Sequence, residues 1–332
     1  MINIIGKRKY TYIASSVLVL ASLFVLFFWG LKLGIDFKGG TLMEVQFSKE
    51  EVATETPPEE TPADAPGAQF PEEQEGEAKE FKAPTREEVQ DKVKDLGLES
   101  LNVQESQDQI IVLRYIGSDE DLNQKVIEKL DEFDGKMEML RVDFIGSSIS
   151  KQLKQNAILA IILATIGIAL YIAWSFRKIS YPIASWQYGV GAIIALAHDI
   201  IITLGIFVLL GRFFNIEIEA SFIAALLTIL GYSVNDTIVV YDRIRENLIK
   251  SDRKEDFETI VNKSIVETIA RSINTSLTVV IVLITIVLFG GESIKYFSLA
   301  ILIGVMFGTY SSIFVASSLL VSNYNIEYKR RV

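Results

Sequence analysis

Long apolar blocks dominate the chain, and six of them can cross a bilayer as helices. The core of a bilayer is spanned by about 20 apolar residues in helical form. The blocks cover residues 11–31, 156–176, 186–210, 221–241, 274–289 and 297–321. The fifth is the shortest, and we expect its helix to begin earlier, near Arg271. The pattern predicts an α-helical membrane protein with six transmembrane helices.

Between the first two blocks the pattern changes to short periodic segments. Alternating apolar positions predict strands at 41–47, 101–105, 110–115 and 137–144, and helical spacing predicts helices at 86–96 and 119–133. The order βαββαβ is that of a small α+β ferredoxin-like domain. We therefore expect a first helix within 1–31, this domain at 32–155, helices two to six at 156–321 and a tail at 322–332.

An acidic insertion interrupts the predicted domain at about 50–84. From residue 50 to residue 80 there are eleven Asp or Glu and one Lys, a net charge of −10 that equals the formal charge of the whole chain. Five of the seven prolines lie in the same stretch. Such a segment buries too little apolar surface to offset its ordering entropy. We predict a disordered, solvated spacer and assign it no function.

The remaining composition excludes common chemistries. Among 332 residues, half are hydrophobic, none is cysteine and one is histidine. A chain without cysteine forms no disulfide, thiolate nucleophile or Cys-ligated zinc site, and one histidine leaves little for a His-rich metal site. We expect no metal, no cofactor and no nucleic-acid partner.

Positive charges in short loops predict the orientation of the helices. Clusters of Lys and Arg lie before the first block, after the second, after the fourth and after the sixth: Lys7, Arg8 and Lys9; Arg177 and Lys178; Arg243, Arg245, Lys250, Arg253 and Lys254; Lys329, Arg330 and Arg331. The opposite short loops carry only Arg212 or Lys295. Both termini are therefore expected in the cytoplasm and the ferredoxin-like domain outside it, which for a bacterial inner membrane means the periplasm or its equivalent.

A few ionisable residues lie inside the apolar blocks, where each costs about 2.5–3.5 kcal/mol on insertion scales. They are His198 and Asp199 in the third block, Asp236 beside Asn235 in the fourth, and Arg271 at the start of the fifth. At 1.5 Å per residue, Asp199, Asp236 and Arg271 lie at depths of about 16, 22 and 28 Å from the outer ends. An ion pair between Asp236 and Arg271 is feasible because this last step is about one helical turn.

Helical spacing predicts inward-facing polar stripes and one close helix contact. Ser233, Asp236 and Thr237 share a face of the fourth helix, and Arg271, Asn274, Thr275 and Thr278 share a face of the fifth. Gly304 and Gly308 form a GxxxG pair that favours close packing. This arrangement favours transport of a proton or ion over anchoring.

Structural alternatives remain open for these polar residues. Asp236 and Arg271 also fit a static pair that fixes helix packing, and His198 beside Asp199 also fits a satisfied hydrogen bond. Asn235 fits packing, or a bond to a backbone carbonyl, better than titration.

The chain resembles the SecF family of bacterial protein translocase subunits, in the resistance-nodulation-division superfamily. The resemblance rests on GIDFKGGT at 34–41, on His198 and Asp199, on GYSVNDTIVVYDRIREN at 231–247 and on the segment 271–278. It covers the chain apart from the acidic insertion, which departs from the usual pattern. In the turn after the first helix, the family positions are Gly34, Asp36, Phe37, Gly39 and Gly40.

The resemblance implies a subunit that assists protein export and is not an enzyme. The implied partners are SecD, with six further spans around a pseudo-two-fold interface, the SecYEG channel, YajC, membrane lipid and a preprotein delivered by SecA. The implied energy source is the proton-motive force, or a sodium gradient in some relatives. Asp236 and Arg271 fall on the acidic and basic functional positions of the family.

We hypothesise that Asp236 binds and releases a proton, tuned by Arg271 and relayed through His198 and Asp199. Two rival classes remain. A small-molecule exporter of the same superfamily usually has twelve spans in one chain and a large substrate-lining external domain. A membrane hydrolase built on His198 and Asp199 needs a nucleophile or metal ligands at matching depth. The sequence leaves open whether the ion is a proton or sodium and how the external domain contacts its client.

Overall fold

The structure is a computed structural model that describes residues 3–48, 83–106, 109–117, 120–177, 183–251 and 255–331. The chain divides into two compact units. A helical bundle consists of Met1–Lys38 and Ser147–Val332, and a sheet unit consists of Gly39–Gly146. Residues 50–82 of the predicted acidic insertion lie outside the described residues.

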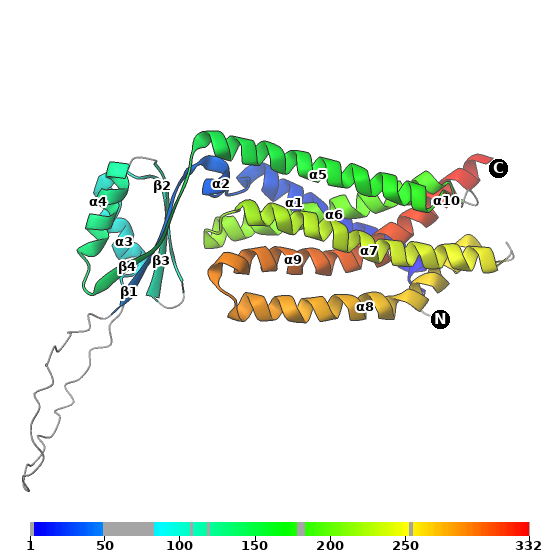
Figure 1. Ribbon diagram of the computed structural model, residues 1–332. Coiled ribbons are helices and arrows are strands. Elements are labelled where there is room, and N and C mark those ends of the chain that lie inside the picture. The colour runs from blue at the N-terminus through cyan, green and yellow to red at the C-terminus, as the bar shows by residue number, and fades with distance from the viewer. Residues whose placement is uncertain are drawn as a thin grey trace, which may run out of the picture. The chain divides into compact units, whose positions relative to one another are not determined.

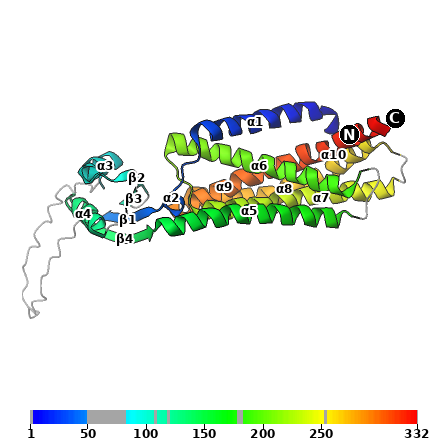
Figure 2. The same ribbon diagram turned by 90° about the horizontal axis from the view of Figure 1, so that it is seen from above.

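The bundle confirms the six predicted membrane helices, counted over the described residues. They are α1 (Arg8–Trp29), α5 (Ser147–Ser175), α6 (Ser185–Phe214), α7 (Ala220–Lys250), α8 (Phe257–Phe289) and a sixth helix. The sixth helix consists of α9 (Glu292–Ser311), the π-helical turn Ser312–Ala316 and α10 (Ser317–Arg331). Figures 1 and 2 show α1, α5 and α8 on the outside of the bundle, around α6, α7 and α9.

Helices α7 and α8 are longer than the apolar blocks that predicted them. Helix α7 continues to Lys250, and α8 begins at Phe257. The added turns are polar and are held by pairs at helical spacing, such as Glu246 with Lys250 at 2.6 Å. Asp256 caps α8 by accepting a hydrogen bond from the Glu258 amide at 3.1 Å. The hydropathy pattern therefore identified only the apolar part of each helix, and both helices extend beyond it by polar turns.

The sheet unit has the predicted ferredoxin-like topology. Its elements are β1 (Gly40–Ser48), α3 (Arg86–Val93), β2 (Glu99–Glu105), β3 (Ile110–Ile116), α4 (Glu120–Asp131) and β4 (Lys136–Ile145). The strands are antiparallel in the order β2-β3-β1-β4. Their alternating apolar residues and the apolar sides of α3 and α4 form one core: Met43, Val45, Phe47, Val89, Val93, Val103, Ile111, Leu113, Tyr115, Val126 and Leu130.

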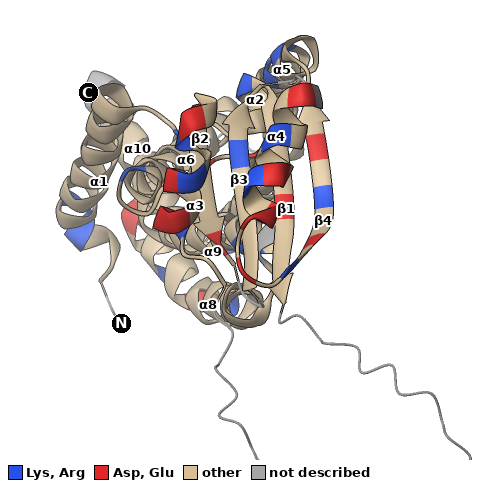
Figure 3. Cartoon of the chain, turned by 90° about the vertical axis from the view of Figure 1, so that its left-hand side faces the viewer, with Lys and Arg blue, Asp and Glu red and all other residues tan. Residues whose placement is uncertain are grey.

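Polar side chains cap helix α3 and lie along the edge strand β4 of the sheet unit. Thr85 and Glu88 form a capping box at the start of α3, in which each side chain accepts a hydrogen bond from the backbone amide of the other. Charged positions recur along the edge strand β4, where Arg141 pairs with Asp143 (Figure 3). The buried core joins strands β1, β2 and β3 to both helices, and no disulfide contributes to it.

Candidate functional site

Two carboxyl groups lie inside the bundle, each surrounded by hydroxyl groups. Asp199 of α6 is fully buried, and its Oδ2 accepts hydrogen bonds from Ser233 Oγ of α7 at 2.6 Å and Ser311 Oγ of the sixth helix at 2.8 Å. Its Oδ1 lies 2.9 Å from His198 Nδ1. The Asp199 carboxyl is thus held by three helices.

His198 has only one of its ring nitrogens engaged. Its Nε2 is buried and has no hydrogen-bond partner among the described residues. The ring stacks on Tyr310, with a centroid distance of 6.0 Å, and the Tyr310 hydroxyl lies 3.1 Å from Ser15 Oγ of α1. Since Ser233 and Ser311 donate to the carboxylate rather than to the imidazole, they do not form the nucleophile and base of a hydrolase with His198.

Asp236 forms the second cluster, on α7. The residue is 3% exposed, and its Oδ2 accepts hydrogen bonds from Ser276 Oγ of α8 and Thr309 Oγ1 of the sixth helix, each at 3.3 Å. These two hydroxyls lie 2.5 Å from each other. Asp236 therefore sits where α7, α8 and the sixth helix meet, with neutral partners only.

Further hydroxyl groups lie on α7 and the sixth helix close to both clusters. Ser233, which donates to Asp199, lies three residues before Asp236, close to one helical turn. The next inward residue, Thr237, lies 2.8 Å from Ser312 of the sixth helix, and Ser312 Oγ donates to the Ser233 carbonyl at 3.3 Å. Ser312 begins the π-helical turn, a feature that is frequent at functional sites.

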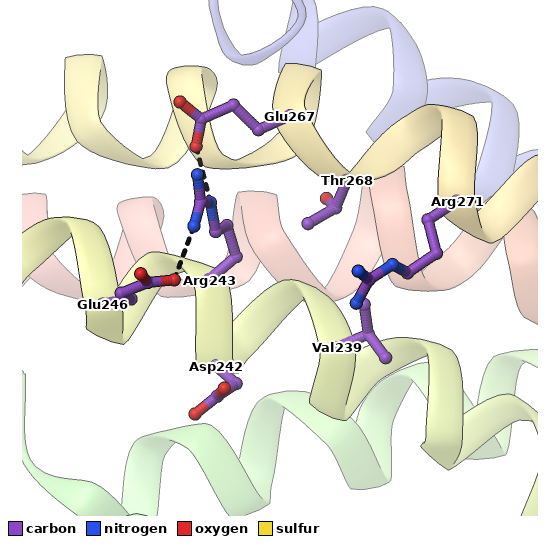
Figure 4. A pocket seen from close by; sticks show the side chains of 7 residues that line it. All are labelled: Val239, Asp242, Arg243, Glu246, Glu267, Thr268 and Arg271. Carbon is purple, nitrogen blue, oxygen red and sulfur yellow. Dashed lines mark hydrogen bonds and ion pairs between the residues drawn. The ribbon is translucent and has the colours of Figure 1, made fainter.

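Arg271 belongs to α8 and makes no ion pair with Asp236 in this structure. It is exposed and lines a polar pocket of about 310 Å³ between α7 and α8. Figure 4 shows its side chain beside Val239. The other lining residues are Asp242, Arg243, Glu246, Glu267 and Thr268. Arg243 bonds to Glu267 at 2.6 Å and to Glu246 at 2.5 Å, so three carboxylates and two guanidinium groups surround the pocket.

The structure places the predicted polar stripe of α8 differently from the sequence expectation. Arg271, Asn274, Thr275 and Thr278 of α8 are exposed, and so is Asn235 of α7. The buried polar residues of α8 are instead Ser264, Thr268, Ser272 and Ser276. Small side chains occupy this inward face because they let α8 lie close to α7 and the sixth helix. The stripe therefore does not face the interior of this chain.

Close helix packing holds the carboxyl clusters together. At Gly308 of α9, an added Cβ would lie 2.9 Å from Ser233 Cβ of α7, and at Gly304 it would collide with Ile229. Both glycines therefore let α9 lie against α7, directly beside the serine that donates to Asp199.

Sequence reasoning missed the hydroxyl donors Ser276, Thr309, Ser311 and Ser312. Serine and threonine are common in membrane helices, so a single one carries little signal. The available signal was position: Thr309, Ser311 and Ser312 directly follow Gly308, which marks the packed side of the helix. Among the described residues, no group of three or more His, Cys, Asp or Glu side chains gathers to hold a metal ion.

The turn after α1 contacts the start of α7. Asp36 Oδ2 accepts a hydrogen bond from the Ala220 amide at 2.6 Å, and Gly34 N donates to the Ile218 carbonyl at 2.9 Å. Phe37 packs on the apolar cluster that includes Ile218 and Phe222. Gly39 and Gly40 follow with φ of 83° and 138°, angles that favour glycine.

Comparison with known proteins identifies the family. Residues 125–325 match the family described as protein export membrane protein SecD/SecF, C-terminal, and residues 24–51 match the SecD/SecF GG motif. A protein translocase subunit SecF of Thermobaculum terrenum is 39% identical over 99% of this chain and 96% of its own length. The SecF subunit of Anaerolinea thermophila is 36% identical over 97% of this chain and 94% of its own length.

Two solved structures have the same fold. The crystal structure of SecDF from Thermus thermophilus, described as a translocon-associated membrane protein, gives a TM-score of 0.77 at 29% identity over 98% of this chain. A structure of SecDF in a super-membrane-facing form gives a TM-score of 0.65 at 28% identity over 99% of this chain. This chain spans 39% and 40% of those longer chains. Because the family match covers more than half of the sequence and the SecF relatives align over nearly their full length, the chain belongs to the SecF family of protein translocase subunits.

Proposed function

We propose that this multi-pass membrane protein is the SecF half of a SecDF-type assembly that uses a cation gradient to promote preprotein export. The observation that carries the proposal is a pair of buried carboxyl groups, Asp199 and Asp236, whose partners are hydroxyls and one imidazole. An ionised carboxylate in such surroundings lacks a compensating charge. Uptake of a proton or a sodium ion supplies that charge.

Asp236 is the proposed coupling residue, with Arg271 as its cationic counterpart. We propose that Arg271 approaches Asp236 when Asp236 loses its cation. We assign the arrangement in which Arg271 lines the polar pocket to the neutral state of Asp236. His198 and Asp199 form the proposed relay on the other side, through Ser233. A potential of 100 mV supplies about 2.3 kcal/mol for each charge that crosses, so a few cations can drive one conformational step.

A second six-span half completes the proposed site. The exposed stripe of Arg271, Asn274, Thr275 and Thr278 is unfavourable against lipid and suits a protein partner. The solved SecDF chains are more than twice as long as the part that this chain matches, which leaves room for the other half. Transporter sites commonly lie at an interface between repeats. We assign that interface to SecD.

The wider assignments follow from the family and the loop charges. The proposed setting is a bacterial inner membrane, with both termini in the cytoplasm and the sheet unit outside. Figure 1 shows both termini at the same end of the bundle, as an even number of spans requires. SecYEG, YajC and a SecA-delivered preprotein are the proposed further partners. The subunit then acts as a translocase accessory rather than as a classical enzyme.

The test uses the variant Asp236→Asn in inverted vesicles that contain the assembled subunits. Asparagine keeps the shape and the acceptor of the side chain, so co-purification with SecD should survive, while the stimulation of export by the gradient should be lost. Collapsing the proton and sodium gradients in turn identifies the ion. Thr228→Val on the exposed side of the same helix is the matched control, since that hydroxyl bonds only to the Ala224 carbonyl. Gradient-stimulated export that is unchanged in Asp236→Asn would refute the coupling role.

A further inference from the structure

Residues Lys32 to Phe37, which we name the link, fasten the chain after α1 to the start of α7. The Ile218 amide donates to the Lys32 carbonyl at 2.8 Å, and the Gly34 amide donates to the Ile218 carbonyl at 2.9 Å. Leu33 and Ile218 form a parallel β-bridge between these bonds. Backbone hydrogen bonds therefore join two segments that are far apart in the sequence.

Asp36 adds a side-chain contact to the first residue of α7. Its Oδ2 lies 2.6 Å from the amide nitrogen of Ala220, and the residue at the N-cap position of α7, Glu219, provides no side-chain cap. The first amides of a helix have no partner within the helix, and a carboxylate there also interacts favourably with the helix dipole. The cap of α7 is therefore supplied by a distant segment.

Apolar side chains pack around this contact. Ile35 is buried, and Phe37 packs against the cluster that contains Phe222 of α7. A Cβ on Gly34 would lie 3.2 Å from the Ile218 carbonyl oxygen, so glycine lets the two backbones approach. The short helix α2 (Ile35–Lys38) also contacts α5, the helix that follows β4 in the chain.

The position of the link along α7 relates it to the coupling residue. Ala220 and Asp236 lie sixteen residues apart on one continuous helix, about 24 Å at 1.5 Å per residue. Past the link, the chain passes through Gly39 and Gly40, both at positive φ, and enters β1. A shift of α7 along or about its axis therefore reaches Asp36 directly, and the covalent chain continues from there into the sheet unit.

We infer that Asp36 is the positioning residue through which movement of α7 is passed to the sheet unit. This assigns a role to the GG motif: the link holds the start of α7, and the two glycines at positive φ connect the link to β1. The inference rests on the proposed function, because it presupposes that cation binding at Asp236 moves α7. It concerns how that movement reaches the sheet unit, whereas Asp236 and Arg271 are proposed to cause the movement.

The test separates cation passage from export in reconstituted vesicles that contain the full assembly. Asp36→Leu keeps the size of the side chain and removes the acceptor, and Asp36→Asn keeps an acceptor. We expect Asp36→Leu to retain gradient-driven cation flux and to lose gradient-stimulated export, and Asp36→Asn to retain both. Lys38→Gln, at the exposed position at the end of α2, is the matched control and should behave as wild type.

Two further variants guard against misfolding of Asp36→Leu. Inserting two glycines between Lys38 and Gly39 leaves every contact of the link in place and lengthens only the connection, so it should also uncouple flux from export. Because the chain has no cysteine, L33C with I218C forms a single engineered disulfide across the β-bridge. That disulfide should restore export to Asp36→Leu by replacing the lost contact with a covalent one.

The outcomes are distinct. Export by Asp36→Leu at the wild-type rate, or a loss of cation flux together with export in both the Leu variant and the glycine insertion, would overturn the role of Asp36. Failure of the proposed function has a different signature: wild-type vesicles would then show no cation flux, or export that does not respond to collapse of either gradient.

Discussion

Replacing Gly308 with alanine tests whether the contact of α9 with α7 sets the geometry of the buried carboxyl cluster. The new Cβ would lie 2.9 Å from Ser233 Cβ and 3.3 Å from its Cα, so the obstruction includes backbone and cannot be relieved by rotating a side chain. Carbon atoms in contact prefer about 3.5–4.0 Å. The two helices must therefore move apart by about 0.6 Å or more at this level.

The cost has two parts. Overpacking of a well-packed interior typically costs about 1–3 kcal/mol. The same movement strains the bond from Ser233 to Asp199, which is 2.6 Å long in the native protein. For a unit of this size, about 2–4 °C of melting temperature is lost per kcal/mol, so we expect a decrease of about 2–12 °C. Gradient-stimulated export should fall with it, since Asp199 loses a donor.

The assay is thermal unfolding of the purified protein in detergent, followed by export in vesicles. Gly231→Ala on α7 is the matched control, because nothing lies within 4 Å of its added Cβ and the position is exposed. In a helix, alanine is favoured over glycine by about 0.5–1 kcal/mol, so this control should melt at or above the wild-type temperature. If Gly308→Ala also melted at or above that temperature, the contact would not constrain the cluster.

Three further predictions concern single side chains. Asp199→Ala should destabilise the protein by about 1–3 kcal/mol because the buried Ser233 hydroxyl loses its acceptor and His198 Nδ1 loses its partner, while Asp199→Asn keeps an acceptor; equal melting temperatures would contradict this. Thr85→Ala removes the capping box of α3 and should cost about 0.5–2 kcal/mol, visible as faster amide exchange in that helix and absent if exchange is unchanged. Burial raises the pKa of Tyr115 from 10.0 to about 12. Because the unfolded chain loses this proton first, stability should fall as pH rises from 10 to 12. In urea unfolding, Tyr115→Phe should lessen that fall, and an identical fall in both proteins would argue against it.

The fold could be predicted because the spacing of apolar residues within each segment indicates whether it forms a helix or a strand. Apolar blocks longer than about 20 residues have few alternatives to membrane helices, and alternation around Met43 and Val45 marks the central strand β1. Hydropathy could not predict how far each helix extends beyond its apolar part. The polar turns of α7 up to Lys250 depend on ion pairs and on α8 beside them, which a window average does not detect.

The site was only partly accessible from the sequence. Charges inside apolar blocks stand out because they are costly, so Asp199 and Asp236 were found from residue type and depth alone. Their partners were not found, because a hydroxyl group costs little free energy in a membrane helix and is common there. Ser276 and Thr309 become recognisable only when three helices are placed around Asp236. Asp36 was noticed as part of a turn, but its contact with Ala220 joins residues 184 positions apart, and no local pattern encodes it.

The polar stripe of α8 shows why a periodic pattern can be detected correctly and still be assigned to the wrong interior. Spacing shows that Arg271, Asn274 and Thr278 share a face, but it does not tell which neighbour covers that face. In this chain the face is exposed, and its polar side chains are unfavourable where they meet lipid. The cost falls if Arg271 opens onto the pocket that it lines with Asp242, and if a second half covers the remaining polar residues. The stripe is thus intelligible as part of an interior shared by two subunits.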